Sequence, residues 1–206
     1  MDEALKVLRK DIYFAPLIKK YGRPPAREHR TVFQSLVRSI IYQQVTGKAA
    51  AAIMARFVAL YPDEIFPTPR HVRDTSIETL RSAGLSGQKA AYIKDLAEKC
   101  TDGTIDEVLL PTMTNDEVIE HLVRVKGIGE WTAHMFLITT LERLDVLPVG
   151  DLGIQKGFKA LYKLRKLPTA KRMEKLAKPW RPYASVASWY LWRVADDERV
   201  KLKLDK

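Results

Sequence analysis

The 206-residue sequence has a single cysteine, Cys100, and this scarcity excludes several kinds of site. One cysteine cannot form a disulfide within the chain, a zinc site made only of cysteines or a four-cysteine iron–sulfur cluster. The four histidines are scattered, and no two of them have the spacing of a helical zinc-binding pair. We therefore expect neither a catalytic metal nor a cofactor.

Long apolar runs are also missing. The most apolar stretch, residues 135–138, covers one helical turn, whereas a membrane-spanning helix needs about 18 or more apolar residues. The first six residues are largely charged and lack the apolar centre of a signal peptide. These features predict a protein without a membrane partner, located in the cytoplasm at the bacterial nucleoid, or in the nucleus if the source is eukaryotic.

Acidic residues are too few to balance the basic ones. There are 25 Asp and Glu against 35 Lys and Arg, which gives a net charge of +10. This excess favours a polyanionic partner, although ribosome-associated and lipid-binding proteins share it. No dense block of Lys and Arg occurs, which favours a folded basic face over a disordered tail. The chain is long enough for one domain, or for two small lobes that share a cleft.

Strand-like alternation is absent, and helical periodicity dominates, so the predicted fold class is all-α. Two capping boxes, Thr75 with Glu78 and Thr114 with Glu117, predict two helix starts. Apolar spacing and alanine content predict the other helices over 28–42, 49–60, 89–100, 130–141, 152–161, 170–178 and 183–194.

The most specific local feature is Gly127-Ile128-Gly129, which lies between two predicted helices. Glycine accepts a positive φ and lets another backbone approach closely. The unpaired amides at the start of the next helix can bind an anion, and Lys126 could add a charged contact. The functional interpretation is a helix-hairpin-helix that grips one DNA phosphate. The alternative is an ordinary turn between two antiparallel helices.

Four blocks extend this pattern along the chain. They are residues 40–49, 126–133, 147–152, and 180–183 with 189–192. Together they resemble the alkyladenine (3-methyladenine) DNA glycosylase II family of the helix-hairpin-helix glycosylase superfamily, from about Glu28 to Val194. The resemblance implies one compact domain over 1–206, with two helical lobes, a DNA cleft between them and no N-terminal β domain. It also implies a monomer whose partner is duplex DNA containing alkylated bases.

The resemblance implies that Asp151 is the catalytic residue. The residues alone favour a helix N-cap, because Asp151 stands between Gly150 and Leu152, and the two roles can coexist. Cleavage of an N-glycosidic bond builds positive charge on the sugar, which a carboxylate can stabilise while it orients water. One carboxylate suffices, because a purine alkylated at N3 or N7 is already cationic and leaves without the second acid that glycoside hydrolases use.

Relatives that also cut the DNA strand carry a lysine two residues after the hairpin, where this chain has Trp131. Without an amine nucleophile at that position, no Schiff base can form there. The sequence therefore predicts a monofunctional hydrolase that leaves an abasic site.

The resemblance also implies a base pocket formed by Trp131, Trp192, Met135 and Tyr42. Aromatic faces stack on a flipped base and attract a cationic one, although core packing is the alternative for any single tryptophan. Met135 replaces a tyrosine of the bacterial prototype and leaves the substrate range open.

Further positions follow from the same resemblance. Gln44, next to Gln43, is expected to fill the gap left by the flipped nucleotide, and Thr46, Gly47 and Lys48 open the next helix, where a phosphate could bind. The carbonyls of Val123, Val125 and Ile128 are expected to hold a monovalent cation when DNA is bound.

Three other functions stay open at this point. The chain could be a non-catalytic DNA-binding protein that uses the same scaffold. It could be a glycosylase for uncharged lesions such as hypoxanthine or ethenoadenine, with Thr132 or His134 as a donor to the leaving base. It could also be a helical scaffold that does not bind nucleic acid.

Overall fold

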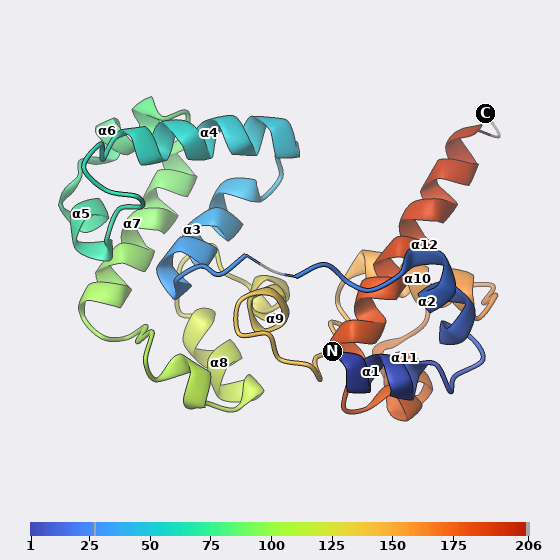
Figure 1. Cartoon of the computed structure of the whole chain (residues 1–206). Helices are drawn as coiled ribbons and strands as arrows, with labels where there is room; N and C mark the ends of the chain where they lie inside the picture. The colour runs from blue at the N-terminus through green and yellow to red at the C-terminus, as the bar shows by residue number, and fades with distance from the viewer. Residues whose placement is uncertain (27, 205–206) are drawn as a thin grey trace. The chain divides into compact units, whose positions relative to one another are not determined.

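The computed structural model describes residues 1–26 and 28–204, with side chains described up to Asp197. Over these residues the regular structure is helical and no strand occurs, which confirms the predicted all-α class. The chain divides into two compact units (Figure 1). Unit 1 comprises Met1–Arg27 and Glu142–Lys206, and unit 2 comprises Glu28–Leu141.

Unit 2 is built from seven α-helices in the part of the chain described. These are α3 (Val32–Tyr42), α4 (Gly47–Ala59), α5 (Pro69–Asp74), α6 (Ile77–Ser82), α7 (Gly87–Thr101), α8 (Asn115–Leu122) and α9 (Glu130–Thr139), with a short 3₁₀ turn η1 (Leu110–Thr112) before α8. Most begin at a Ser or Thr whose side chain accepts the amide three residues later, as Thr31, Thr46 and Ser86 do. The long helices α3 and α7 pack together through fully buried residues that include Leu36, Ile40 and Leu96.

Two predictions for unit 2 were wrong in detail. The helix expected from residue 28 begins at Val32, because Thr31 accepts the Gln34 amide as its cap. The predicted capping box of Thr75 with Glu78 does not form. Ser76 caps α6 instead, while Thr75 ends α5, a helix that the sequence analysis missed.

The second capping box, Thr114 with Glu117, is confirmed in full at the start of α8. The helix α5 was not predicted because it begins with Pro69, a residue that interrupts a helix when it lies inside one. Proline is well tolerated in the first turn of a helix, where its missing N–H has no partner to lose.

Unit 1 combines the two ends of the chain. Its helices are α1 (Asp2–Leu8), α2 (Phe14–Tyr21), α10 (Leu152–Leu161), α11 (Ala170–Ala177), the 3₁₀ turn η2 (Lys178–Trp180) and α12 (Ala184–Leu204). The bounds predicted for α10 are confirmed, and α12 runs past the predicted end at residue 194. The first two helices were not predicted.

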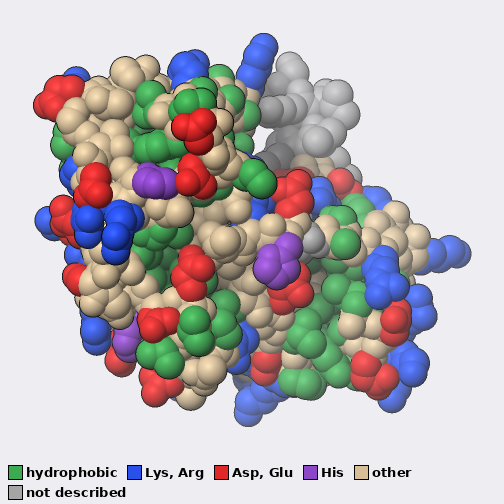
Figure 2. All heavy atoms as spheres, turned by 60° about the vertical axis from the view of Figure 1, so that its left-hand side comes forward, with side chains coloured by type: hydrophobic (Ala, Val, Ile, Leu, Met, Phe, Trp, Pro, Cys, Tyr) green, Lys and Arg blue, Asp and Glu red, His purple; other side chains and the backbone are tan. Residues whose placement is uncertain are grey.

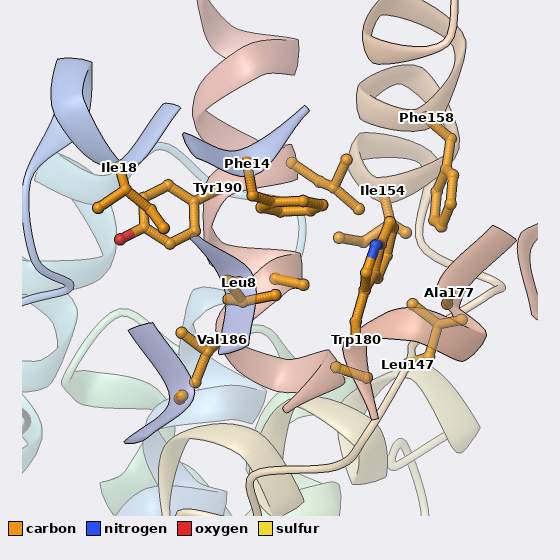
Figure 3. Close-up of a cluster of buried hydrophobic side chains, with 14 of the residues drawn as sticks. Leu8, Phe14, Ile18, Leu147, Ile154, Phe158, Ala177, Trp180, Val186 and Tyr190 are labelled. Atoms are coloured by element: carbon orange, nitrogen blue, oxygen red, sulfur yellow. The ribbon is translucent and has the colours of Figure 1, made fainter. Parts of the chain in front are cut away.

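The core of unit 1 is centred on Trp180, which has no exposed surface (Figure 3). Its ring lies 4.8 Å from that of Phe14, edge to face, and 5.1 Å from that of Phe158, stacked. Trp180 is therefore a core residue, and Tyr183 and Trp189 pack against the same cluster.

Helices α10 and α12 approach unusually closely, and this contact positions the candidate site of unit 1. A Cβ placed on Gly157 of α10 would lie 2.4 Å from the backbone oxygen of Leu191 in α12, so only glycine fits. The contact sets the distance between the first turn of α10, where Asp151 stands, and Trp192 on α12.

The surface of the described chain is mixed in character. Figure 2 shows one face, on which acidic and basic side chains are interspersed with small apolar areas. Within the described residues, no helix is both long enough and apolar enough to span a bilayer.

Candidate functional site

The double-glycine turn of unit 2 joins α8 to α9 and depends on Gly127. This residue has φ +81°, and a Cβ added to it would lie 2.1 Å from the Tyr92 ring of α7. Gly129 differs, because its backbone is extended and a Cβ there would meet nothing within 4 Å. Gly129 stands at the N-cap of α9, so the first amides of that helix point out of the turn.

Asp95 of α7 holds the double-glycine turn in place through the residue before Gly127. Its buried carboxylate accepts the backbone amide of Lys126 at 2.9 Å and the ammonium of Lys99 at 2.7 Å, and the Lys126 ammonium lies 3.4 Å away. Burial raises the pKa of Asp95, but the hydrogen bonds from Lys99 and Lys126 outweigh it and hold that pKa below its usual value. Asp95 was not predicted, although an acid on the buried side of the predicted 89–100 helix was a signal.

Gln43 also ties the turn to its neighbours. Its side-chain amide donates to the carbonyl of Gly127 at 2.9 Å. The ammonium of Lys89 donates to the carbonyls of Ile41 and Gln43, 2.7 Å each, and thereby satisfies the end of α3. Desolvation lowers the pKa of Lys89. The structure gives Gln43 a structural role, and its predicted DNA contact stays a prediction.

Gln44 follows in the left-handed region, with φ +56°, and its side chain is exposed. Such a conformation is uncommon for a residue other than glycine and costs of order 1–3 kcal/mol, which the surrounding contacts offset. The Lys89 bonds and the start of α4 hold this turn. An exposed side chain held on a constrained backbone fits the predicted wedge.

A cavity of about 620 Å³ lies beside the turn, entirely within unit 2. Its walls include Trp131, Met135, Tyr42 and both Gln43 and Gln44. Half of the Trp131 surface is exposed, and Thr132, one of the alternative donors, also lines the cavity. The structure thus brings together three of the four predicted pocket residues with the predicted wedge. Their roles remain predictions.

Two arginines, Arg30 and Arg38, line the same cavity and were not predicted. The guanidinium carbon of Arg38 lies 3.8 Å from the centre of the Tyr42 ring. One face of Tyr42 is therefore covered by a cation, and its predicted place in a base pocket stays a prediction. No lysine lines this cavity in the described part of the chain.

Unit 1 holds Asp151 at the N-cap of α10. The side chain is only 9% exposed, and its Oδ1 accepts the Ile154 amide at 2.7 Å and the Trp192 indole N–H at 2.9 Å. The N-cap role, open from the sequence, is thus a fact of the structure. Two donors on one oxygen fix the plane of the carboxylate.

The same bond gives Trp192 a role other than the predicted one. Trp192 is half-buried against the core of unit 1, and its indole N–H holds Asp151. It is therefore a positioning residue for that carboxylate, and its place in a base pocket stays a prediction. Gly153, which the sequence analysis missed, makes room for this pair. A Cβ there would lie 2.9 Å from both Asp151 Oδ1 and Trp192 Cδ1.

The remaining predicted contacts lie at helix ends. Thr46 caps α4 by accepting the Ala49 amide, and Gly47 and Lys48 are exposed in its first turn. The arrangement fits a phosphate site, which remains untested.

The predicted cation site is formed from backbone alone. Val123 ends α8, and the carbonyl of Val125 already accepts the Ile128 amide at 3.0 Å, which leaves it a second lone pair. Among the described residues no cluster of His, Cys, Asp or Glu is arranged to bind a metal. The three carbonyls could hold a monovalent cation, and this too stays a prediction.

The sequence and the fold are similar to those of known DNA repair proteins. Residues 37–182 match the family model of the HhH-GPD superfamily base excision DNA repair proteins. DNA-3-methyladenine glycosylase 1 of Schizosaccharomyces pombe is 36% identical over 185 residues, which cover 87% of this chain and 79% of that protein.

Two solved structures are similar over nearly the whole chain. One is the fission yeast 3-methyladenine DNA glycosylase Mag1 in complex with abasic DNA, with a TM-score of 0.82, 36% identity and coverage of 93% of this chain and 95% of that one. The other is a DNA-3-methyladenine glycosidase from Bacillus halodurans, with a TM-score of 0.83, 38% identity and coverage of 93% and 88%.

Proposed function

This chain belongs to the HhH-GPD superfamily of base excision DNA repair proteins, and on that basis we propose that it is a DNA glycosylase. It hydrolyses the N-glycosidic bond of alkylated purines of the 3-methyladenine and 7-methylguanine type in duplex DNA. The observation that carries the proposal is the buried carboxylate of Asp151, held by two N–H donors at the start of α10.

Asp151 supplies negative charge where the reaction develops positive charge. As the bond between C1′ and the base nitrogen breaks, its electron pair passes to the cationic base, which leaves neutral. The sugar becomes oxocarbenium-like, and a fixed carboxylate in a site of low polarity stabilises that state strongly. Water then adds to C1′, and its proton passes to the carboxylate or to solvent. Trp192 keeps the carboxylate in place during this step.

The cavity of unit 2 takes the base, and Trp131 provides the exposed ring for stacking. Removing a base from the stack costs a few kcal/mol, and stacking on an aromatic ring recovers about 1–3 kcal/mol. Gln44 fills the vacated space in the duplex. The amides after Gly129 bind one phosphate, and Lys126 and Lys48 add charged contacts.

The enzyme is monofunctional. The position that carries the Schiff-base lysine in strand-cutting relatives is Trp131 here. Among the described residues the cavity walls contain arginines but no lysine, and an arginine does not lose its proton to become a nucleophile. We therefore expect an abasic product without strand cleavage, and no covalent enzyme–DNA adduct after borohydride treatment. The protein acts as a monomer.

A second candidate substrate is an uncharged purine such as hypoxanthine, and Arg38 favours it. The guanidinium over Tyr42 repels a cationic base, whereas it can donate to the O6 oxygen of an oxidised or deaminated purine. Thr132 lines the same cavity and could donate as well. His134, the other donor considered, is not among the lining residues, and burial lowers its pKa.

One experiment separates these functions. Duplexes that each carry 3-methyladenine, 7-methylguanine or hypoxanthine are incubated with excess enzyme, and free base and abasic sites are quantified over time. Fastest release of the methylated bases supports the proposal. Preferential release of hypoxanthine supports the second candidate. Tight binding of all three duplexes with no release would show a non-catalytic DNA-binding protein and refute both.

A further inference from the structure

The positive charge of the chain is concentrated in one short segment of unit 1. Residues 156–178 contain nine Lys and Arg and one acid, Glu174, a net charge of +8. The rest of the chain has 26 basic and 24 acidic residues and is nearly neutral. We call these nine side chains the basic surface.

All nine side chains of the basic surface are exposed, and none forms an ion pair within the described part of the chain. Elsewhere in the described chain some cations are paired, as Lys99 is with Asp95 and Arg181 with Asp145, whereas the basic surface holds no such pair. Unpaired like charges repel one another and destabilise the folded state slightly, a cost that an anionic partner would remove. The pattern indicates binding rather than surface stability.

Part of the basic surface surrounds a depression. A depression of about 800 Å³ lies between the end of α10 and the start of α11, and Lys163, Arg165, Lys166 and Arg172 line it. Lys163 has φ +50°, so the connecting loop turns sharply there. Four cations around one depression can neutralise several phosphates at once.

Two features identify the polyanion. The apolar side of α11 is buried through Met173 and Ala177, so this helix has no apolar face to insert into a membrane. The aromatic ring in the depression, Tyr162, is stacked on Phe158 at 6.0 Å and is only partly exposed, so it cannot serve as a platform for unstacked bases. The other lining residues are uncharged, and Leu167 is the one large apolar side chain exposed there, so every charge in the lining is positive, which suits the phosphates of duplex DNA.

We infer that the basic surface is a second DNA-binding surface, which contacts the backbone of undamaged duplex independently of the double-glycine turn in unit 2. This inference rests on the proposed function for its partner. The surface raises the affinity for any duplex, and so the rate of finding a lesion, without taking part in base release.

The test compares two triple variants of equal net charge. The first, Lys163→Gln/Arg165→Gln/Lys166→Gln, removes three cations of the depression. The control, Lys19→Gln/Arg70→Gln/Arg81→Gln, removes three exposed cations outside the segment. The affinity of each for an undamaged duplex of about 25 base pairs is measured from low to high salt. The slope of log affinity against log salt falls by about 0.9 for each phosphate that the protein no longer neutralises.

We expect the slope of the first variant to be smaller than that of the parent by about 2 to 3, and the control to stay close to the parent. Base release at saturating enzyme should stay unchanged in both, which keeps this test apart from that of the proposed function. Equal slopes for the first variant and the parent would overturn the inference, as would equal reductions in both variants. A weakening of binding only to anionic phospholipid vesicles, or only to single-stranded oligonucleotides, would also overturn it.

Discussion

Replacing Gly127 by alanine should be far more damaging than replacing Gly129. At Gly127 the backbone is left-handed, which costs about 1–2 kcal/mol for a residue with a Cβ. The new Cβ would also lie 2.1 Å from the Tyr92 ring, so the ring must move. Its movement would disturb the 2.6 Å bond from Gln88 to the Tyr92 hydroxyl and the local packing, at about 1–3 kcal/mol. We expect a total reduction of about 2–5 kcal/mol in the free energy of unfolding.

The assay is urea unfolding of the parent, Gly127→Ala and Gly129→Ala, together with the affinity for duplex DNA. Gly129 has room for a Cβ and an extended backbone, so its variant should be destabilised by only about 1 kcal/mol or less at the N-cap. In a Gly127→Ala background, Tyr92→Ala should restore part of the DNA affinity, because it removes the overlap. Equal effects of the two glycine variants on stability and affinity would refute the reasoning.

Three further predictions follow from single contacts. Trp192→Phe removes the indole donor to Asp151 but keeps a ring in place. Base release should therefore slow at least about tenfold, while DNA affinity and melting temperature change little. An unchanged rate of base release would remove Trp192 from the mechanism. Gly157→Ala forces a Cβ against Leu191 and should cost about 1–3 kcal/mol by thermal unfolding, whereas Gly150→Ala, with nothing within 4 Å, should be nearly neutral. The pKa of Asp95 in the folded protein lies below its ordinary value of 3.8, so as the pH falls the unfolded chain binds a proton at Asp95 before the folded protein does, and the free energy of unfolding should fall as the pH drops below 3.8. Asp95→Asn should be less stable at neutral pH and should lose less stability in acid. Parallel profiles of stability against pH for the variant and the parent would contradict this.

The features that the sequence predicted well depend on neighbouring residues. The helix α10 was predicted with its final bounds because Asp151, its cap, stands directly before an apolar helical pattern. The box of Thr114 and Glu117 closes within one helical turn and was equally readable. Where two caps competed, at Thr75 and Ser76, spacing alone chose the wrong one.

What the sequence could not show depends on contacts between distant segments. Asp95 meets Lys126 across 31 residues, Trp192 meets Asp151 across 41, and Gln43 meets Gly127 across 84. Two of these bonds give a predicted residue a further role, since Gln43 and Trp192 hold other groups in place, and the third involves Asp95, for which no role was predicted. Periodicity identifies the buried side of a helix, but not the partner that a buried polar group finds there.

The most direct test of the account is Asp151→Asn. Asparagine caps a helix about as well as aspartate and can still accept from Ile154 and Trp192, so the fold and DNA affinity should be preserved while the negative charge is removed. Release of 3-methyladenine under single-turnover conditions should slow at least about 100-fold, the scale of one preorganised electrostatic group. A variant that releases the base at the parent rate would contradict the central claim that this carboxylate drives the reaction.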